Sequence, residues 1–247
     1  YLGTVDDSPD QWRWSRTGPD GRWTPEPRGR ERAFAKYDGV LAGLARGTIP
    51  AFVNFGEGYQ EQLGVMAYQR TLDRQLLSLL DWPVWDSVTS EFEAALTDSV
   101  IAAAVAQLPP EYLAGGASFL AAGLRARRDL LPKAAQGLYR LINQEAAFFG
   151  TPGADTVTVT RMQDGALELA FQDGFRRVYA PGETDAVALY LGGGADRINL
   201  AGPGRAGPIL DVAWHPGLTL AGGRGSGQRT KVYGGGPRTG GMRLDIV

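Results

Sequence analysis

The sequence predicts an α+β protein, with a helical, bundle-like part over residues 1–150 and a glycine-rich antiparallel β domain over residues 151–247. Two observations favour this division. Apolar residues recur at steps of three and four along residues 118–149, which is the period of a helix. From Asp155 onward apolar and polar residues alternate, as in strands, and more than half of the 35 glycines follow Phe149.

Residues 118–149 are predicted to form one long helix. Pro132 removes a backbone donor and clashes with the preceding turn, so a kink or a break is expected there. Gly150 is a natural stop, because glycine adopts the left-handed cap conformation without steric cost. Three arginines lie mostly off the apolar stripe and are expected to stay in water: Arg125, Arg127 and Arg128.

The first residues predict a short aromatic hairpin, because Gly18-Pro19-Asp20-Gly21 has strong turn chemistry and lies between Trp14 and Trp23. Helical spacing then resumes over residues 30–46, and a short helix is expected over residues 72–80. The predicted buried side of the first of these helices has four members: Phe34, Val40, Leu41 and Leu44.

Further helices are expected after Pro83, which is favoured in a first turn, and over residues 99–108, where Thr97 or Asp98 can provide the N-terminal cap. Short connections favour antiparallel neighbours. In the β domain, Asp164-Gly165 predicts a tight hairpin turn between two alternating segments. The β domain is interpreted as a meander, a small sandwich or a short solenoid.

Composition excludes several classes of function. The net charge of −2 gives no general attraction to phosphate backbones, so no nucleic-acid partner is expected. Without cysteine there are no disulfides, thiolate metal sites or cysteine nucleophiles. No apolar run is long enough to span a membrane. Since the chain begins at Tyr1, we expect it to be a processed product or a piece of a longer chain.

An acidic cluster near the N-terminus is a candidate for chemistry. Asp6, Asp7 and Asp10 precede Gln11-Trp12, and carboxylates this close can bind magnesium or act as a general base. The alternative is a solvated, turn-rich terminus.

Two segments carry a family resemblance. VDDSPDQWRW followed by PEPRGRERAFAKYDG resembles the C-terminal part of a kinase-like module related to the spore-coat CotH kinases, with degenerate motifs. Such modules occur in bacterial proteins that continue into an outer-membrane surface-antigen barrel. The resemblance extends to LRARRDLLPKAAQGLYRLI and to LYLGGGADRI, and so covers most of the chain.

The resemblance assigns roles to individual residues. Asp6 matches the catalytic acid, Asp10 and Gln11 match the part downstream, and Glu31 matches a second metal-binding aspartate. It thus implies metal ligation by Asp10 and Glu31 and cofactor binding by Gln11. Gly29 stands where the first metal-binding aspartate belongs, which removes a ligand that phosphoryl transfer needs.

A glycine-rich segment suggests a second cation. GGGADRI at residues 192–198 resembles one turn of a calcium-binding nonapeptide repeat, in which Asp196 would coordinate the ion. A near-copy that starts at Gly222 has no aspartate, and a plain glycine turn is the alternative. His215 lies beside Trp214 and is interpreted as a turn residue.

These features lead to three functional hypotheses. The first is a non-catalytic structural or interaction module of a larger bacterial envelope protein, whose partners are flanking domains of the parent chain, including a membrane barrel. The second is an ATP- and magnesium-dependent phosphotransferase fragment with Asp6 as base. The third is a calcium- or glycan-binding surface module. The first hypothesis implies no cofactor and a location in the periplasm or at the outer membrane.

Overall fold

The computed structural model describes residues 1–3, 11–30, 33–45, 52, 54–59, 70–223, 229–234 and 245–246. Contacts divide the chain into two compact units. The helical unit comprises Tyr1–Leu72 and Trp85–Leu138, and the β unit comprises Asp73–Val84 and Tyr139–Val247. The predicted α+β class is confirmed, because both helices and sheets are well represented.

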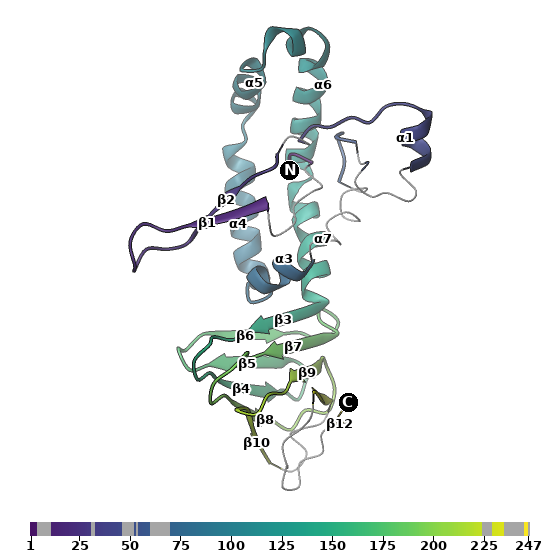
Figure 1. Cartoon of the computed structure of the whole chain (residues 1–247). Coiled ribbons are helices and arrows are strands. Elements are labelled where there is room, and N and C mark those ends of the chain that lie inside the picture. Colours follow the sequence, from purple (N-terminus) through teal and green to yellow (C-terminus); the bar gives the residue numbers. More distant parts are fainter. Residues whose placement is uncertain are drawn as a thin grey trace. The chain divides into compact units, whose positions relative to one another are not determined.

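The elements before the β unit's sheets are a two-stranded hairpin and six helices among the described residues (Figure 1): β1 Trp12–Ser15, β2 Thr24–Pro27, α1 Val40–Ala45, α3 Arg70–Leu77, α4 Trp82–Ala95, α5 Asp98–Ala106, α6 Pro110–Asp129 and α7 Leu131–Asn143. The predicted aromatic hairpin is confirmed, since β1 pairs with β2 in antiparallel register. Gly18 lies in its turn with φ of 78°, a conformation that favours glycine.

The core of the helical unit forms where α5 packs against α6. Ile101 and Val105 of α5 contact Leu124 of α6 and the ring of Phe55. Gly123 makes room for that ring, because a Cβ atom at this position would lie 2.8 Å from the Phe55 ring. The predicted cap of α5 is confirmed, since the Thr97 hydroxyl accepts a hydrogen bond from the Val100 N–H.

The prediction of one long helix over residues 118–149 is wrong, because this range contains the end of one helix, a second helix and a strand. The chain leaves the helical conformation at Leu130, between the end of α6 and the start of α7. Pro132 lies in the first turn of α7, in line with the expected break. The last residues of the range form a strand, β3 Glu145–Phe149, with Ala146 buried in the sheet core. Pairing with other strands therefore overrides the helical propensity of the two alanines at positions 146 and 147.

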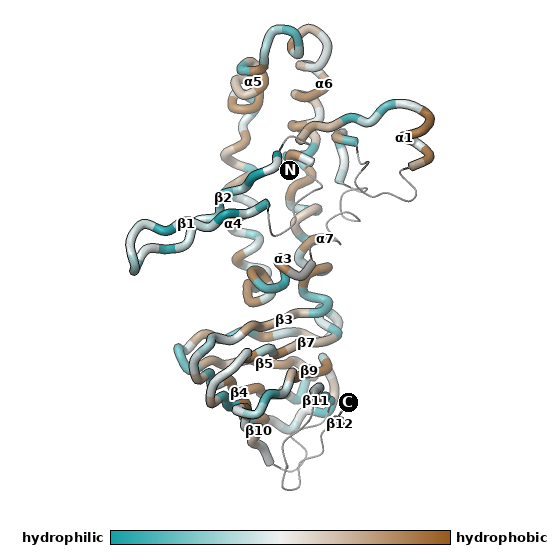
Figure 2. The backbone as a smooth tube through the Cα atoms, viewed as in Figure 1, coloured by the Kyte–Doolittle hydropathy of each residue, from teal (hydrophilic) through white to brown (hydrophobic). Residues whose placement is uncertain are grey.

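The helix predicted over residues 30–46 is also shorter than expected. Among the described residues of this range, α1 alone is helical, and Figure 2 shows how apolar it is. Its large side chains are exposed, contrary to the prediction, with exposed fractions of 81% for Val40, 83% for Leu41 and 73% for Leu44. Phe34 alone of the predicted set packs on the helical core, through an edge-to-face contact with Phe55.

The β unit contains two five-stranded sheets. The first has the strand order β10-β8-β4-β5-β6 and the second the order β12-β11-β9-β7-β3. The bounds after β3 are β4 Thr156–Arg161, β5 Leu167–Phe171, β6 Arg176–Tyr179, β7 Ala186–Tyr190, β8 Arg197–Ala201, β9 Ile209–Ala213, β10 Thr219–Gly222, β11 Thr230–Tyr233 and β12 Asp245–Ile246.

The chain alternates between the two sheets, so that β3–β4, β7–β8 and β9–β10 form successive coils that stack in parallel register. This is the arrangement of a short two-sheet solenoid. The expectation of an antiparallel domain is therefore wrong for most strand pairs. It holds for β4, β5 and β6, where Asp164-Gly165 forms the predicted tight turn and Gly165 has φ of 91°.

Alternating residues of each strand fill the space between the sheets. The fully buried members include Val157, Leu169, Val187, Ile198 and Leu210. The predicted period of two is confirmed, because the neighbours of these residues in the strands face outward or are only partly buried. Apolar burial of this kind supplies the main stabilisation of the β unit.

The free edge of β3 is covered by the segment that follows α3. The Ser78 hydroxyl accepts a hydrogen bond from the Ala147 N–H, and the Ser78 carbonyl accepts one from the buried Tyr179 hydroxyl. Arg74 adds an ion pair to Glu145 at 2.8 Å. Covering an edge strand in this way satisfies backbone groups that would otherwise pair with another chain.

Candidate functional site

Three of the predicted site residues, Asp6, Asp10 and Glu31, lie outside the described residues. Gln11 is described and is half-buried. Its carbonyl accepts a hydrogen bond from the Arg28 N–H at 2.7 Å. Its side chain lies directly against Gly29, where a Cβ atom would stand 1.7 Å from Gln11 Oε1.

The backbone conformation at position 29 favours glycine. Gly29 has φ of 64°, a conformation that strains most other residues, and a Cβ atom there would displace the flexible end of the Gln11 side chain. Nearby, the Phe34 N–H donates to the Leu2 carbonyl at 3.2 Å, which joins the start of the chain to the residues after Glu31.

Asp196 is almost fully buried at the start of β8, and both of its carboxylate oxygens have protein neighbours. Oδ1 accepts a hydrogen bond from the Asp155 N–H at 2.8 Å, and Oδ2 lies 2.8 Å from His215 Nε2. His215 Nδ1 in turn accepts from the Gly217 N–H at 3.2 Å, so the nitrogen that faces Asp196 carries the proton in the neutral ring. The carboxylate therefore links three stacked turns.

The glycines of these turns permit close stacking of the coils. A Cβ atom at Gly217 would lie 1.8 Å from the Gly194 carbonyl oxygen, and one at Gly194 would lie 2.5 Å from the Gly153 carbonyl oxygen. The glycine-rich pattern that resembles a calcium repeat thus has a packing role in this structure. Among the described residues, no group of three acidic, histidine or cysteine side chains is arranged to hold a metal ion.

Arg127 is the central polar residue of the helical unit and is fully buried, contrary to the expectation that it stays in water. Its guanidinium donates to the carbonyls of Tyr1 at 2.7 Å and Gly58 at 2.6 Å and lies over the Tyr59 ring at 4.0 Å. Burial lowers the pKa of Arg127 and raises the pKa of Tyr59 to about 12. These contacts fix loop segments on α6.

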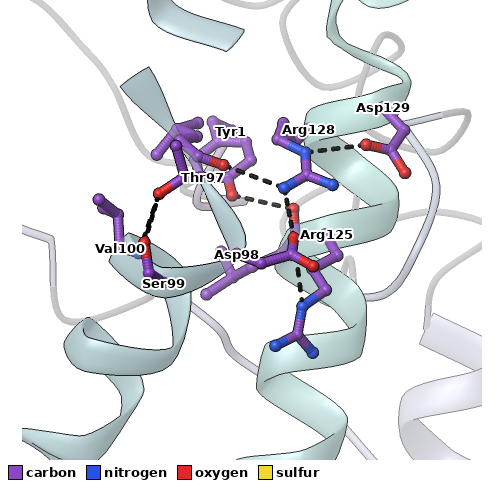
Figure 3. Close-up of polar contacts among 10 residues, drawn as sticks. Tyr1, Thr97, Asp98, Ser99, Val100, Arg125, Arg128 and Asp129 are labelled. Carbon is purple, nitrogen blue, oxygen red and sulfur yellow. Dashed lines mark hydrogen bonds and ion pairs between the residues drawn. The ribbon is translucent and has the colours of Figure 1, made fainter. Parts of the chain in front are cut away.

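Its neighbours on α6 form an exposed ion cluster (Figure 3). Arg128 donates to Asp98 at 2.6 Å and to Asp129 at 2.8 Å, and Arg125 lies 3.5 Å from the same Asp98 carboxylate. The hydrogen bond from Arg128 holds the pKa of Asp98 below its usual value. The cluster joins the first turn of α5 to α6 and gives the half-buried Arg125 and Arg128 a structural role.

A second buried arginine, Arg177 on β6, organises a polar network that the sequence did not reveal. It donates to Glu183 at 2.9 Å, to the Tyr139 hydroxyl at 3.0 Å and to Asn143 at 3.3 Å. The Tyr139 hydroxyl also contacts Glu183. Burial raises the pKa of Tyr139 to about 12. The residues come from α7, β6 and a turn, so only the fold brings them together.

The outer face of the second sheet carries a row of exposed aromatic side chains. Phe149, Tyr190 and Tyr233 end the strands β3, β7 and β11, with exposed fractions of 39%, 44% and 38%. Phe149 and Tyr190 are direct neighbours in register, with ring centroids 4.9 Å apart, and Ala213 occupies the equivalent place on β9. We call Phe149, Tyr190 and Tyr233 the aromatic row.

Polar groups border the aromatic row. The Tyr233 hydroxyl donates to Asp211 Oδ1 at 3.3 Å, and desolvation together with that carboxylate raises the pKa of Tyr233. Lys231 lies beside Asp211 in the parallel register of β11 and β9. The row therefore offers apolar area with donors and acceptors next to it. The sequence contains one signal for the aromatic row, because a glycine follows each of its three aromatic residues within two positions.

The described residues contain no helix with both the length and the apolar character needed to cross a membrane. Comparisons with protein-family models, with curated proteins and with solved structures find no significant match to this chain.

Proposed function

We propose that this chain is a non-catalytic structural or interaction module of a larger bacterial envelope protein. The observation that carries the proposal is the aromatic row, an exposed set of aligned rings on the face of stacked coils. Stacked coils repeat equivalent positions at the strand spacing, which produces extended binding surfaces. The envelope location follows the resemblance to kinase-like modules that precede an outer-membrane barrel.

The aromatic row has the energetic character of a contact surface. Full burial of one large apolar side chain stabilises a protein by about 1.5–3 kcal/mol, and each ring of the row is still about 40% exposed. Covering the remainder would therefore contribute roughly 1 kcal/mol per ring. A partner, such as a flanking domain of the parent chain, gains this energy when it covers Phe149, Tyr190 and Tyr233.

Calorimetric titration with ATP and magnesium, and then with ATP and manganese, tests the non-catalytic part of the proposal. We expect no binding heat, because Gly29 lacks the carboxylate that a metal-bound nucleotide requires. Micromolar binding, equivalent to about −8 kcal/mol, together with autophosphorylation would overturn it.

A kinase-like phosphotransferase fragment is the second candidate. It is favoured by the two backbone contacts that join neighbouring parts of the predicted motif, Arg28 to Gln11 and Phe34 to Leu2. In this hypothesis Asp6 is the base and Glu31 a metal ligand. A version of the chain extended towards the N-terminus should then hydrolyse ATP, and Asp6→Asn should abolish turnover. Unchanged turnover in that variant would exclude Asp6 as the base.

A calcium- or glycan-binding surface module is the third candidate. Its glycan part is favoured by the polar groups of Asp211, Lys231 and Tyr233 beside exposed rings, since sugars offer both apolar faces and hydroxyl groups. Tyr190→Ser should then weaken retention of the chain on an immobilised polysaccharide that it binds. Its calcium part requires a melting temperature that rises with added calcium. We expect no such rise, because the Asp155 N–H occupies one oxygen of Asp196 and the His215 ring lies against the other.

A further inference from the structure

The β1–β2 hairpin presents an exposed face of tryptophan and proline. We call residues 11–30 the tryptophan hairpin. Side chains of a strand alternate between its faces, so Trp12 and Trp14 share one face, and their register partners Pro27 and Pro25 share it with them. Trp23 is placed opposite Arg16, whose guanidinium lies 4.9 Å from the Trp23 ring centroid.

This apolar face is open to solvent. Trp14 is 41% exposed and Trp23 is 57% exposed, and every residue of β2 is exposed. In Figure 1 the turn of the hairpin points away from the helices of its own unit. A two-stranded hairpin with one uncovered apolar face is marginally stable in water, so a surface that covers this face stabilises it.

The same segment is strongly basic. Residues 11–30 contain five arginines and two carboxylates, which gives a net charge of +3 on a chain whose net charge is −2. Two of the arginines lie on the apolar face, Arg16 over the Trp23 ring and Arg30 over the Trp12 ring, each 4.9 Å from the ring centroid. Arg13 faces the other side, opposite Glu26. Apolar rings and cationic groups therefore occupy one surface.

We propose that the tryptophan hairpin binds the surface of an anionic lipid bilayer. The bilayer interface provides both required environments within a few ångströms, because Trp rings reside at headgroup depth and guanidinium groups pair with phosphates in bidentate fashion. The complementarity of charge selects anionic over neutral lipid. A soluble anionic polymer without aromatic groups, such as heparin, would pair with the arginines but would leave the faces of Trp14 and Trp23 in water.

Vesicle sedimentation with the 247-residue chain tests this inference. We expect sedimentation with phosphatidylcholine vesicles that contain phosphatidylglycerol, little with phosphatidylcholine alone, and weaker binding as salt screens the arginines. The double variant Trp14→Ser/Trp23→Ser should reduce binding about ten-fold or more, and Arg16→Gln/Arg30→Gln should reduce both binding and its salt dependence.

Tyr112→Ser is the matched control, because Tyr112 is an aromatic residue that is 64% exposed on α6 of the same unit. This variant should bind vesicles as strongly as the parent chain does. Unchanged melting temperatures show that the variants fold. Three outcomes would overturn the inference: no sedimentation with anionic vesicles, equal binding by the tryptophan variant, or binding to heparin that is as strong as binding to vesicles. None of these outcomes bears on the aromatic row, so the proposed function is tested separately.

Discussion

His215 Nε2 lies 2.8 Å from Asp196 Oδ2, and this contact joins two stacked turns of the β unit through a carboxylate that is almost fully buried. Because the other oxygen of Asp196 accepts the Asp155 N–H, one side chain connects successive coils at the same corner. The residue with the strongest resemblance to a calcium ligand is therefore an internal clamp of the solenoid in this structure.

Removal of one partner of the clamp should destabilise the β unit. His215→Ala removes the ring that lies against the buried Asp196 carboxylate, which costs about 1–3 kcal/mol of unfolding free energy. Denaturant unfolding followed by near-ultraviolet circular dichroism measures the loss. Asp185→Asn changes an exposed carboxylate of the same unit and should stay within about 0.5 kcal/mol of the parent chain. Equal stability of the two variants would contradict the clamp.

Addition of one methyl group at the stacked turns should be costly where a glycine lies against the neighbouring coil and harmless where it does not. Gly217→Ala places a Cβ atom 1.8 Å from the Gly194 carbonyl oxygen, so neighbouring coils must separate, at a cost of about 3 kcal/mol. Gly193→Ala is the control from the same corner, because no atom lies within 4 Å of its added Cβ. Thermal melting of both variants decides the issue, and a tolerated Gly217→Ala would show that the turns are not stacked this closely.

Replacement of Arg127 should loosen the helical unit. Arg127→Met leaves the carbonyls of Tyr1 and Gly58 without their donor and removes the cation over the Tyr59 ring, at a cost of about 2–4 kcal/mol. Urea unfolding monitored at the helical circular-dichroism band reports this change. Arg125→Gln, on the same helix but partly exposed, should have little effect. A larger loss for Arg125→Gln than for Arg127→Met would refute the central role of Arg127.

Alkaline pH should weaken the β unit through Tyr139. The pKa of Tyr139 is about 12 in the folded state, against 10.0 for an unperturbed tyrosine, so the unfolded chain loses this proton first. The resulting stability is complete below pH 10 and is lost as the pH rises towards 12, because fewer protons are then bound in the unfolded state. In Tyr139→Phe, urea midpoints measured across this interval should depend less on pH than in the parent chain. An unchanged slope would exclude Tyr139 as the source.

Local patterns in the sequence determined the local structure. The Asp164-Gly165 turn and the Gly18 turn each placed a hairpin correctly, and Thr97 marked the start of α5, because a turn or a cap depends on a few adjacent residues. The alternation after Asp155 determined which side chains of the strands are buried, since the period of a strand fixes its faces.

The tertiary structure alone decided the features that depend on distant parts of the chain. The buried state of Arg127 depends on Tyr1, 126 positions away, and the network of Arg177 depends on Tyr139, 38 positions away. The direction of each strand also depends on distant parts of the chain. A glycine turn permits either a hairpin or a crossing to the opposite sheet, and only the packing of all coils selects one of the two. The aromatic row follows from that selection, since parallel register aligns Phe149 with Tyr190.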